Sequence, residues 1–302
     1  LGMHPFLELG DAKVWPHRDR QIYRALSKIF NINQHGWLNI QSFQLNLSYS
    51  GEDRAMKLHN ALANILPYIP AISASSPIYE SKIGGCADNR LHFYQINQKE
   101  VPSITGDVVP EYVRSFEEYR KTTIQRYSLD LTRFNAPKSI LFKEWMNSRG
   151  AIFRFDRKAI EIRIMDEQEC IKSDVALSCF IRALLRGLLR KSKNRLPHLP
   201  HDVLVNDLSA VIKSGLDAQV RHPAGSTARE VCCHLYRIAE ESASPEERRY
   251  LWIIKRRIEE GNLSNLVLRA VAKKAQRTDL EEAILNVYSS LTENLRENKV
   301  YI

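Results

Sequence analysis

The segment Ala159–Asp166 (AIEIRIMD) carries a carboxylate and a guanidinium that are two residues apart. Its apolar and polar residues alternate, which is the pattern of a β-strand with one face in a core. Glu161 and Arg163 are therefore expected on one face, roughly 7 Å apart, with the isoleucines on the other. Such a pair can bind a cation and a phosphoryl group. The alternative is an exposed ion pair on a solvated sheet face, which contributes little.

A second predicted strand, over residues 38–49, has the same design. Gln44 and Asn46 share one face of it, while phenylalanine and leucine residues alternate on the other. Two interpretations stay open for this pair. The amides either line a ligand site on a polar sheet face, or they are ordinary outward-facing strand positions.

Residues 151–155 and 159–165 are predicted to form a β-hairpin, with the turn at residues 156–158. Arg154 lies in the first strand of this hairpin, between two phenylalanines. In an antiparallel sheet with helices on its apolar side, the polar groups of these strands would gather on the other side. Carboxylates and amides hold Mg²⁺ through oxygen, and arginines neutralise a phosphoryl group in transfer. The chain has neither a Walker-type loop nor a dinucleotide-binding glycine pattern, so an ATP enzyme here would need another architecture.

The elements that position these residues divide the chain into two regions. Residues 1–196 are predicted to form an α+β catalytic region, and residues 197–302 a helical region packed on the same domain. Residues 1–9 are expected as a short strand or edge segment, and residues 83–110 as a loop that could cover the site. Helices are predicted at residues 19–30, 50–69, 111–129 and 140–147, from Ser173-Asp174 onward, and at 201–215, 226–242, 245–260, 263–276 and 278–297.

The composition indicates the cellular compartment of the protein and the charge of its partners. No apolar run approaches the roughly 18 residues that a membrane span needs. The five cysteines form no C-x-x-C pair, which favours a reduced, cytoplasmic protein, and Cys232 and Cys233 are expected to be core thiols. The net charge of +9 fits an anionic partner: nucleic acid, a nucleotide or acidic metabolites. Solvated helix faces would explain the basic clusters, which are Arg182, Arg186, Arg190, Lys191, Lys193 and Arg195, and Arg248, Arg249, Lys255, Arg256 and Arg257.

A nucleic-acid-binding helical protein is disfavoured, because acidic residues alternate with these bases and no nucleic-acid module is recognised. It would show salt-sensitive binding to DNA or RNA.

The order of several short motifs resembles the type 2 glutamate–cysteine ligase family of carboxylate–amine ligases. The motifs span essentially the whole chain, and Gln44-x-Asn46 is similar to the corresponding strand of plant-type glutamate–cysteine ligases. The motifs that carry the resemblance are, in chain order, Gly2-Met3-His4-Pro5-Phe6, Gln44-Leu45-Asn46-Leu47-Ser48, Ser73-Ala74-Ser75-Ser76-Pro77 with Glu80, Asn89-Arg90, Arg154, Ile160-Glu161-Ile162-Arg163-Ile164-Met165-Asp166, and Gly261-Asn262 with Arg269.

This resemblance implies a glutamine-synthetase-like fold, with an antiparallel sheet curved around the active site and helices on its outer face. It implies ATP and Mg²⁺ as cofactors and small-molecule substrates, without nucleic acid or membrane, in an enzyme that can form a homo-oligomer. The γ-carboxylate of glutamate would become an acyl phosphate. An amine, with cysteine favoured, would then attack it to give γ-glutamylcysteine.

The resemblance also implies roles for individual residues. Glu161 resembles a Mg²⁺ ligand and Arg163 a contact to the transferring phosphoryl group. Asn46 would contact the metal or nucleotide, with Gln44 beside it. Arg90 and Arg154 would bind phosphate or the substrate carboxylate.

Two departures from the family pattern matter. The first strand of the family carries a Glu-x-Glu pair that supplies most metal ligands, and nothing here matches it. The chain is therefore expected either to lack N-terminal strands or to have lost the usual metal site, and the alternative function is a catalytically silent, ligase-like binding or regulatory protein. Gln44-x-Asn46 in place of the family's His-x-His leaves the identity of the amine open.

Overall fold

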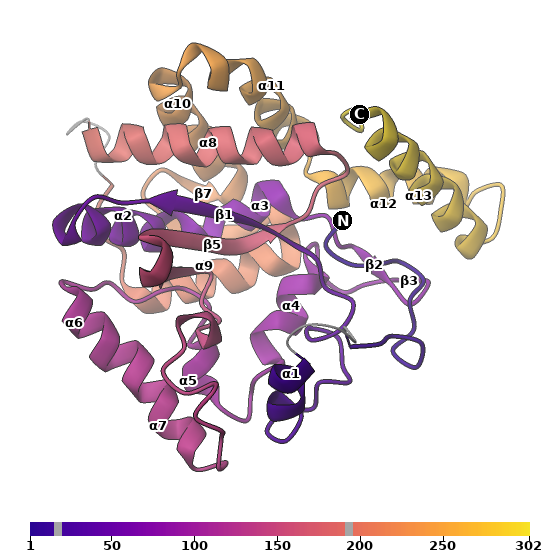
Figure 1. Cartoon of the computed structure of the whole chain (residues 1–302). Helices are drawn as coiled ribbons and strands as arrows, with labels where there is room; N and C mark the ends of the chain where they lie inside the picture. The colour runs from indigo at the N-terminus through magenta and orange to yellow at the C-terminus, as the bar shows by residue number, and fades with distance from the viewer. Residues whose placement is uncertain (15–19, 191–195) are drawn as a thin grey trace.

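The main sheet has three antiparallel strands in the order β1-β5-β4 (Figure 1). The computed structural model describes residues 1–14, 20–190 and 196–302. The strands predicted at residues 38–49, 151–155 and 159–165 are confirmed, and so is the hairpin formed by the last two. The strands are β1 (Ser42–Ser48), β4 (Ala151–Arg154) and β5 (Ala159–Asp166).

The register of the strands brings the polar residues together on one face. Asn46 of β1 lies opposite Glu161 of β5, and Leu47 lies opposite Ile160. Successive strand residues point to opposite faces, so Asn46 and Glu161 share a face and the isoleucines belong to the other. The alternation in the sequence therefore predicts correctly which residues of β1 and β5 share a side.

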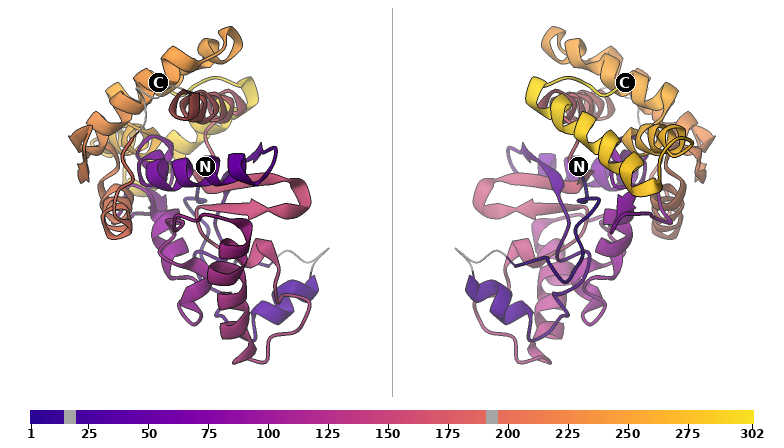
Figure 2. Two further views of the ribbon diagram at one scale, coloured as in Figure 1. Left: turned by 90° about the vertical axis from the view of Figure 1, so that its left-hand side faces the viewer. Right: turned by 90° about the vertical axis from the view of Figure 1, so that its right-hand side faces the viewer.

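Helices pack against the apolar face of the sheet. α3 contacts β5, α2 contacts β4, and α8 packs with α2, α10 and α11. Figure 1 shows α8 above the strands with α10 and α11 beyond it, and the side views of Figure 2 agree with this layering. The bounds are α2 (Glu52–Ile65), α3 (Ile69–Ser73), α8 (Ile171–Arg190), α9 (His201–Ser214), α10 (Ala228–Ser242) and α11 (Pro245–Glu260).

One hydrophobic core runs through most of these elements. It includes Leu62 of α2, Ile162 of β5, Phe180 of α8 and Leu235 of α10, all buried. Residues from both predicted regions, 1–196 and 197–302, thus contribute to the same core. Burial of this much apolar surface is the main force that holds the helices on the sheet.

The remaining elements surround this core. Below the sheet in Figure 1 lie α1 (Arg20–Leu26), α4 (Asn89–Ile96), α5 (Pro102–Thr105), α6 (Phe116–Tyr119), a π-helical segment (Arg120–Gln125) and α7 (Arg126–Thr132). At the right, α12 (Leu263–Lys274) and α13 (Leu280–Glu297) form a helical hairpin with a small core of its own. Two short antiparallel hairpins are β2 (Ile78–Tyr79) with β3 (Lys82–Ile83), and β6 (Gln219–His222) with β7 (Gly225–Thr227).

The protein is therefore a mixed α/β molecule, mostly helical, with small antiparallel sheets. Among the described residues, no helix has both the length and the apolar character to cross a bilayer. The cysteines are all free.

Several predicted elements differ from those observed. Residues 1–9 form no strand, because His4 Nδ1 accepts the backbone amides of Phe6 and Leu7 at 3.2 and 3.0 Å and holds a turn. Residues 83–110 are not a loop throughout, since α4 and α5 lie within them. Pro102 opens α5, a position where a missing amide proton costs nothing.

Three further differences concern the second half of the chain. Residues 140–147 form only a 3₁₀ turn, Glu144–Met146, and the β6–β7 hairpin interrupts a C-terminal third predicted as wholly helical. Cys232 is buried but Cys233 is exposed, because neighbouring helix residues point about 100° apart. The predicted helix start at Asp19 and the basic residues Lys191, Lys193 and Arg195 lie outside the described residues.

The central strand offers a test of this packing. Ile162 is fully buried, so Ile162→Ala should lower the free energy of unfolding by about 2–5 kcal/mol, from lost burial and the resulting cavity. Leu285→Ala, at a 55% exposed position of α13, is the control and should change it by less than about 0.5 kcal/mol. Urea unfolding measures both, and equal effects would contradict the assignment of Ile162 to the core.

Candidate active site

Glu161 is the centre of a buried charge cluster on the polar face of the sheet. Only 1% of it is exposed. Its Oε1 accepts from Arg163 Nη2 at 2.5 Å and Nε at 3.2 Å, and its Oε2 accepts from Arg154 Nη1 at 2.7 Å. Arg157, from the hairpin turn, approaches Oε2 to 3.7 Å. The alternative of an exposed ion pair at Glu161 and Arg163 is therefore wrong.

Arg154 connects this cluster to two further carboxylates. Its guanidinium lies 3.4 Å from Asp156 and 3.6 Å from Glu144. Glu144 is itself fixed, because both of its oxygens accept the backbone amide of Phe155 at 3.0 Å. Arginines and carboxylates thus alternate along the hairpin, and each buried charge has an opposite charge beside it, as desolvated charges require.

The pKa values of the cluster follow from this pairing. Burial by itself would raise the pKa of Glu161, but the charges of Arg163 and Arg154 and their hydrogen bonds outweigh it and lower that pKa. Burial opposes the charge of Arg163, while Tyr94 of α4 and Glu161 raise its pKa. Glu161 is thus an ionised carboxylate, held in a low-dielectric site by cations that are always charged.

The amides of β1 form the open side of this face. Gln44 and Asn46 are both exposed, and Asn46 lies directly across from Glu161. Side chains of directly opposite antiparallel residues are roughly 5 Å apart at Cβ. The structure therefore brings together Asn46, Glu161, Arg154 and Arg163, as predicted, with the solvent-facing amides next to the buried charges.

Metal binding by these residues alone is not supported by their arrangement. Within the described parts of the chain, no group of three or more His, Cys, Asp or Glu side chains could hold a metal ion. Glu161 and Asn46 are only two ligand side chains in adjacent positions, and the arginines occupy both oxygens of the carboxylate. A bound Mg²⁺ would need additional oxygens from a ligand and from water, which is how Mg²⁺ binds in most phosphate sites.

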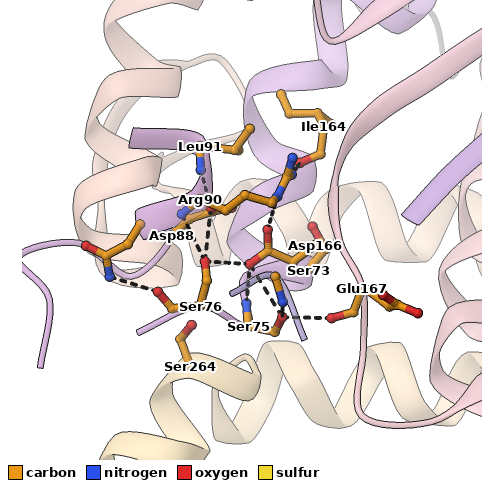
Figure 3. Close-up of polar contacts among 12 residues, drawn as sticks. Ser73, Ser75, Ser76, Asp88, Arg90, Leu91, Ile164, Asp166, Glu167 and Ser264 are labelled. Atoms are coloured by element: carbon orange, nitrogen blue, oxygen red, sulfur yellow. Dashed lines mark hydrogen bonds and ion pairs between the residues drawn. The ribbon is translucent and has the colours of Figure 1, made fainter. Parts of the chain in front are cut away.

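Arg90 does not join this cluster. It is 1% exposed and forms a buried ion pair with Asp166 at the end of β5, while its Nη2 donates to the Ile164 carbonyl at 2.6 Å (Figure 3). Arg90 is therefore not a solvated loop residue, because its side chain belongs to the packed interior. Its role as a nucleotide contact remains a prediction.

Asp166 gathers several segments around the ion pair. Its Oδ2 accepts the Ser75 amide at 2.8 Å and the Ser76 hydroxyl at 2.7 Å (Figure 3). Gly2 lies flat against it, and a Cβ at this position would meet Asp166 at 2.4 Å. The Ser-Ala-Ser-Ser-Pro and Gly-Met-His-Pro-Phe motifs therefore both serve to enclose one buried carboxylate.

Asp88 is a second buried carboxylate beside this pair. Its Oδ1 accepts the Leu91 amide at 2.8 Å as the N-cap of α4, while its Oδ2 has no hydrogen-bond partner among the described residues. Ser76 links it to Asp166, with 3.4 Å between Ser76 Oγ and Asp88 Oδ1. Burial and the charge of Asp166 raise the pKa of Asp88 to about 8.

Sequence reasoning did not assign roles to several of these residues. Asp166 stands in a quoted motif, yet only its position at the strand end makes it the partner of Arg90. Asp88 carries a detectable signal, an aspartate just before a helix, which is a common N-cap. The glycines and prolines of residues 83–110 predicted a loop there, so this N-cap was not recognised. Glu144 and Tyr94 have no local pattern that would mark them.

Comparison with known proteins identifies relatives across the chain. The model of the family described as glutamate-cysteine ligase family 2 matches residues 1–287. An uncharacterized protein of Archaeoglobus fulgidus is 46% identical over 302 residues, which are 100% of this chain and 76% of that protein.

More distant relatives carry ligase names. The "Putative glutamate--cysteine ligase 2" of Solibacter usitatus is 24% identical over 281 residues, 89% of this chain and 66% of its own length. The "Putative glutamate--cysteine ligase 2-1" of Rubrobacter xylanophilus is 24% identical over 222 residues, 72% of this chain and 52% of its own length. The chain thus spans between half and two-thirds of the length of these two ligase-named relatives.

The Arg90–Asp166 pair should be a main source of stability. Asp166→Asn leaves a buried guanidinium without its counter-charge, so the free energy of unfolding should fall by about 3–5 kcal/mol. Asp53→Asn removes an exposed carboxylate that pairs with Lys57 and should cost less than about 1 kcal/mol. Chemical denaturation of both variants measures the difference, and a comparable loss in both would show that the buried pair has no special weight.

Asp88 should make stability depend on pH. Its folded pKa of about 8 exceeds the unfolded value near 3.9, so the folded state binds more protons between these values. Stability from this group is therefore highest below about pH 4 and is lost as the pH rises through about 8.

Asp88→Asn keeps an acceptor for the Leu91 amide and should remove this decline. The measurement is the free energy of unfolding of the wild type minus that of the variant, across this pH range. Asp88→Ala should lower stability at every pH through loss of the cap. A pH-independent difference between wild type and Asp88→Asn would contradict the raised pKa.

Proposed function

Because the chain belongs to the glutamate-cysteine ligase family 2, we propose that it is an ATP-dependent ligase that joins the γ-carboxyl group of glutamate to an amine. The γ-carboxylate oxygen would attack the terminal phosphorus of ATP, and ADP would leave with the electrons of the broken P–O bond. The amine nitrogen would then attack the acyl carbon, lose a proton and release inorganic phosphate. Cysteine is the favoured amine, which would give γ-glutamylcysteine.

The observation that carries the proposal is the position of Glu161 between Arg154 and Arg163, across from Asn46. Transfer of a phosphoryl group needs cations that are already in place where negative charge is carried. Guanidinium groups bind phosphate and carboxylate with the same two-pronged geometry. The guanidinium groups of the two arginines could therefore release the carboxylate of Glu161 and bind the phosphates of a nucleotide through hydrogen bonds of the same kind.

Magnesium fits this site only together with a nucleotide. Glu161 would become a ligand once an arginine has moved to the phosphates, and Asn46 would supply a second oxygen. Phosphate oxygens and water would complete the six ligands that Mg²⁺ prefers. The bound ion would neutralise phosphate charge during transfer.

We also propose the fold around the site, the cellular compartment and the oligomeric state. The sheet β1-β5-β4 would be part of a glutamine-synthetase-like sheet that curves around the substrates. The reaction would take place in a reduced, cytoplasmic environment, for which the free cysteines are suitable. Assembly into a homo-oligomer also belongs to the proposal.

A catalytically silent, ligase-like binding or regulatory protein is the second candidate. The observation that favours it is that the arginines already occupy both oxygens of Glu161, and that no group of three metal-ligating side chains occurs among the described residues. Such a protein would bind a nucleotide on the same face but would not turn it over.

Release of ADP from Mg-ATP, in the presence of glutamate and each of several amines, separates the two candidates. The measurement uses the chain and also a form that includes any coding sequence upstream of Leu1. A ligase should release ADP over repeated turnovers only when both glutamate and the amine are present. Nucleotide binding without turnover for any amine in either form would reject the ligase and favour the silent protein.

Variants of the polar face test the site itself. Glu161→Gln should lower turnover by at least about a hundredfold, through loss of the charge that holds the arginines and metal. Because this change also affects a buried cluster, Asn46→Ala at an exposed position is the second variant, with an expected loss of roughly threefold to tenfold and an unchanged melting temperature. Asn286→Ala, exposed on α13, is the matched control. Unchanged activity in both Glu161→Gln and Asn46→Ala would place the site elsewhere.

A further inference from the structure

A groove lined by arginines lies at the end of β1, and its lining does not include Glu161. It has a volume of about 250 Å³ and is formed by the end of β1, the first turns of α2 and the second half of α8. Figure 1 shows α8 above β1 with α2 beside the strand. Its lining residues are Leu47, Ser48, Arg54, Leu58, Arg182, Leu185, Arg186, Leu189 and Arg190.

Three of its arginines form a stripe along α8. Arg182, Arg186 and Arg190 are four residues apart, which places them one above another on a helix. Like charges at this spacing repel each other and destabilise a helix unless an opposite charge compensates them. The sequence pattern alone indicates a solvated basic face. The structure adds Arg54 of α2, which lines the same groove as the three arginines of α8.

A single carboxylate compensates part of this charge. Glu247 of α11 accepts from Arg186 Nη1 at 2.6 Å and Nη2 at 2.9 Å, and it lies 3.6 Å from Arg182. Glu247 is buried and also accepts the Ser244 amide as part of the α11 capping box. Both oxygens of Glu247 are therefore already bonded to groups of α8 and of the α11 N-terminus. Glu247 does not compensate the charges of the other groove arginines, Arg54 and Arg190.

Two arginines of the groove have no such partner. Arg54 and Arg190 are exposed, and neither forms an ion pair or hydrogen bond with any residue that the structure describes. The sequence that follows α8, from residue 191 to residue 195, contains no acidic residue. Four guanidinium groups thus face one carboxylate that is already engaged.

The walls between the arginines strengthen this field. Leu47, Leu58 and Leu185 line the groove together with the charges. Apolar walls lower the local dielectric and focus the potential of nearby charges, which attracts anions more strongly than a flat, hydrated surface does. The groove is distinct from the candidate active site in its lining, because none of Asn46, Glu161, Arg154 and Arg163 lines it. Leu47 of the groove belongs to the apolar side of the sheet, and Ser48, which follows it, is at the end of β1.

We propose that this groove binds a compact polyanion that carries two or more phosphate groups. The planar guanidinium matches the geometry of phosphate oxygens, and several arginines in one concavity favour a ligand with several charges. The volume is suited to a short polyphosphate chain. The same chemistry could come from a free inorganic polyphosphate or from the phosphates of a nucleotide. An extended nucleic acid would require a longer basic surface.

Titration calorimetry with inorganic tripolyphosphate, without magnesium and at low ionic strength, tests the proposal. The wild-type chain should bind one equivalent, and added salt should weaken binding. The double variant Arg54→Gln/Arg190→Gln should bind at least roughly tenfold more weakly, because two charge-assisted contacts are lost. Its melting temperature without ligand should equal that of the wild type, since neither side chain has a partner to lose among the described residues.

Matched controls separate a site from a general charge effect. Arg237→Gln/Lys273→Gln removes two exposed charges from α10 and α12 and should leave binding unchanged. Glu161→Gln should also leave it unchanged, which distinguishes the groove from the proposed active site. ATP in place of tripolyphosphate identifies a nucleotide source if it binds the groove more tightly, with the same dependence on Arg54 and Arg190.

Three results would overturn the proposal. The first is the absence of tripolyphosphate binding to the wild type. The second is equal binding by the wild type and the Arg54/Arg190 variant, or an equal loss in the control pair. The third is tight binding of duplex DNA that is weakened equally by both double variants, which would identify a diffuse basic face.

Discussion

The buried ion pair between Arg90 and Asp166 is the constraint on which the polar face of the sheet depends. Taking two charges out of water is costly, and the cost is offset only when the remaining donors and acceptors are also satisfied. Here Ser75, Ser76 and the Ile164 carbonyl supply those partners. They come from the segment that follows α3 and from β5, while Arg90 comes from α4, so three parts of the chain meet at this ion pair. Because Arg90 also holds the backbone of β5 at Ile164, it fixes the strand that carries Glu161 and Arg163.

The Glu161 cluster shows how burial converts a simple pair into a possible reaction site. On an exposed strand, Glu161 and Arg163 would contribute little. The hairpin brings Arg154 and Arg157 to the same carboxylate and removes water from it. Charges held in such a site are oriented before any ligand arrives, which is the condition for electrostatic catalysis. In the part of the chain that the structure describes, no group of three metal-ligating side chains is present, and both oxygens of Glu161 are already bonded to arginines.

The two arginine-rich regions differ in how their charges are compensated. Arg154 is buried and Arg163 is largely covered, and each has a carboxylate within hydrogen-bond distance. Arg54 and Arg190 are exposed, where water can solvate a guanidinium that has no partner. Buried charges must be matched inside the protein, whereas exposed charges can stay free for a ligand. The unpaired positive charge is therefore found at exposed positions such as Arg54 and Arg190, whereas the arginines around Glu161 are paired with carboxylates.

Local periodicity was sufficient to predict much of the fold. The alternation in residues 42–48 and 159–166 predicts β1 and β5 and the side to which Asn46, Glu161 and Arg163 point, and the helical spacing predicts α8 to α13 closely. It failed at α4, where the cap at Asp88 outweighs the glycines and prolines nearby, and at the short β6–β7 hairpin. Short elements have few residues to establish a period, and neighbouring packing decides them.

The sequence by itself determined the family, the order of the main elements and the pairing of polar residues on two strands, because these depend on residue type and on spacing along the chain. Only the tertiary structure decided that Glu161 is buried among three arginines, that Arg90 holds Asp166, and that Arg54 meets the stripe on α8. Each of these contacts joins residues from different elements or depends on how completely water is excluded. Burial and the meeting of distant segments are properties of the packed molecule, and no local pattern of residues specifies them.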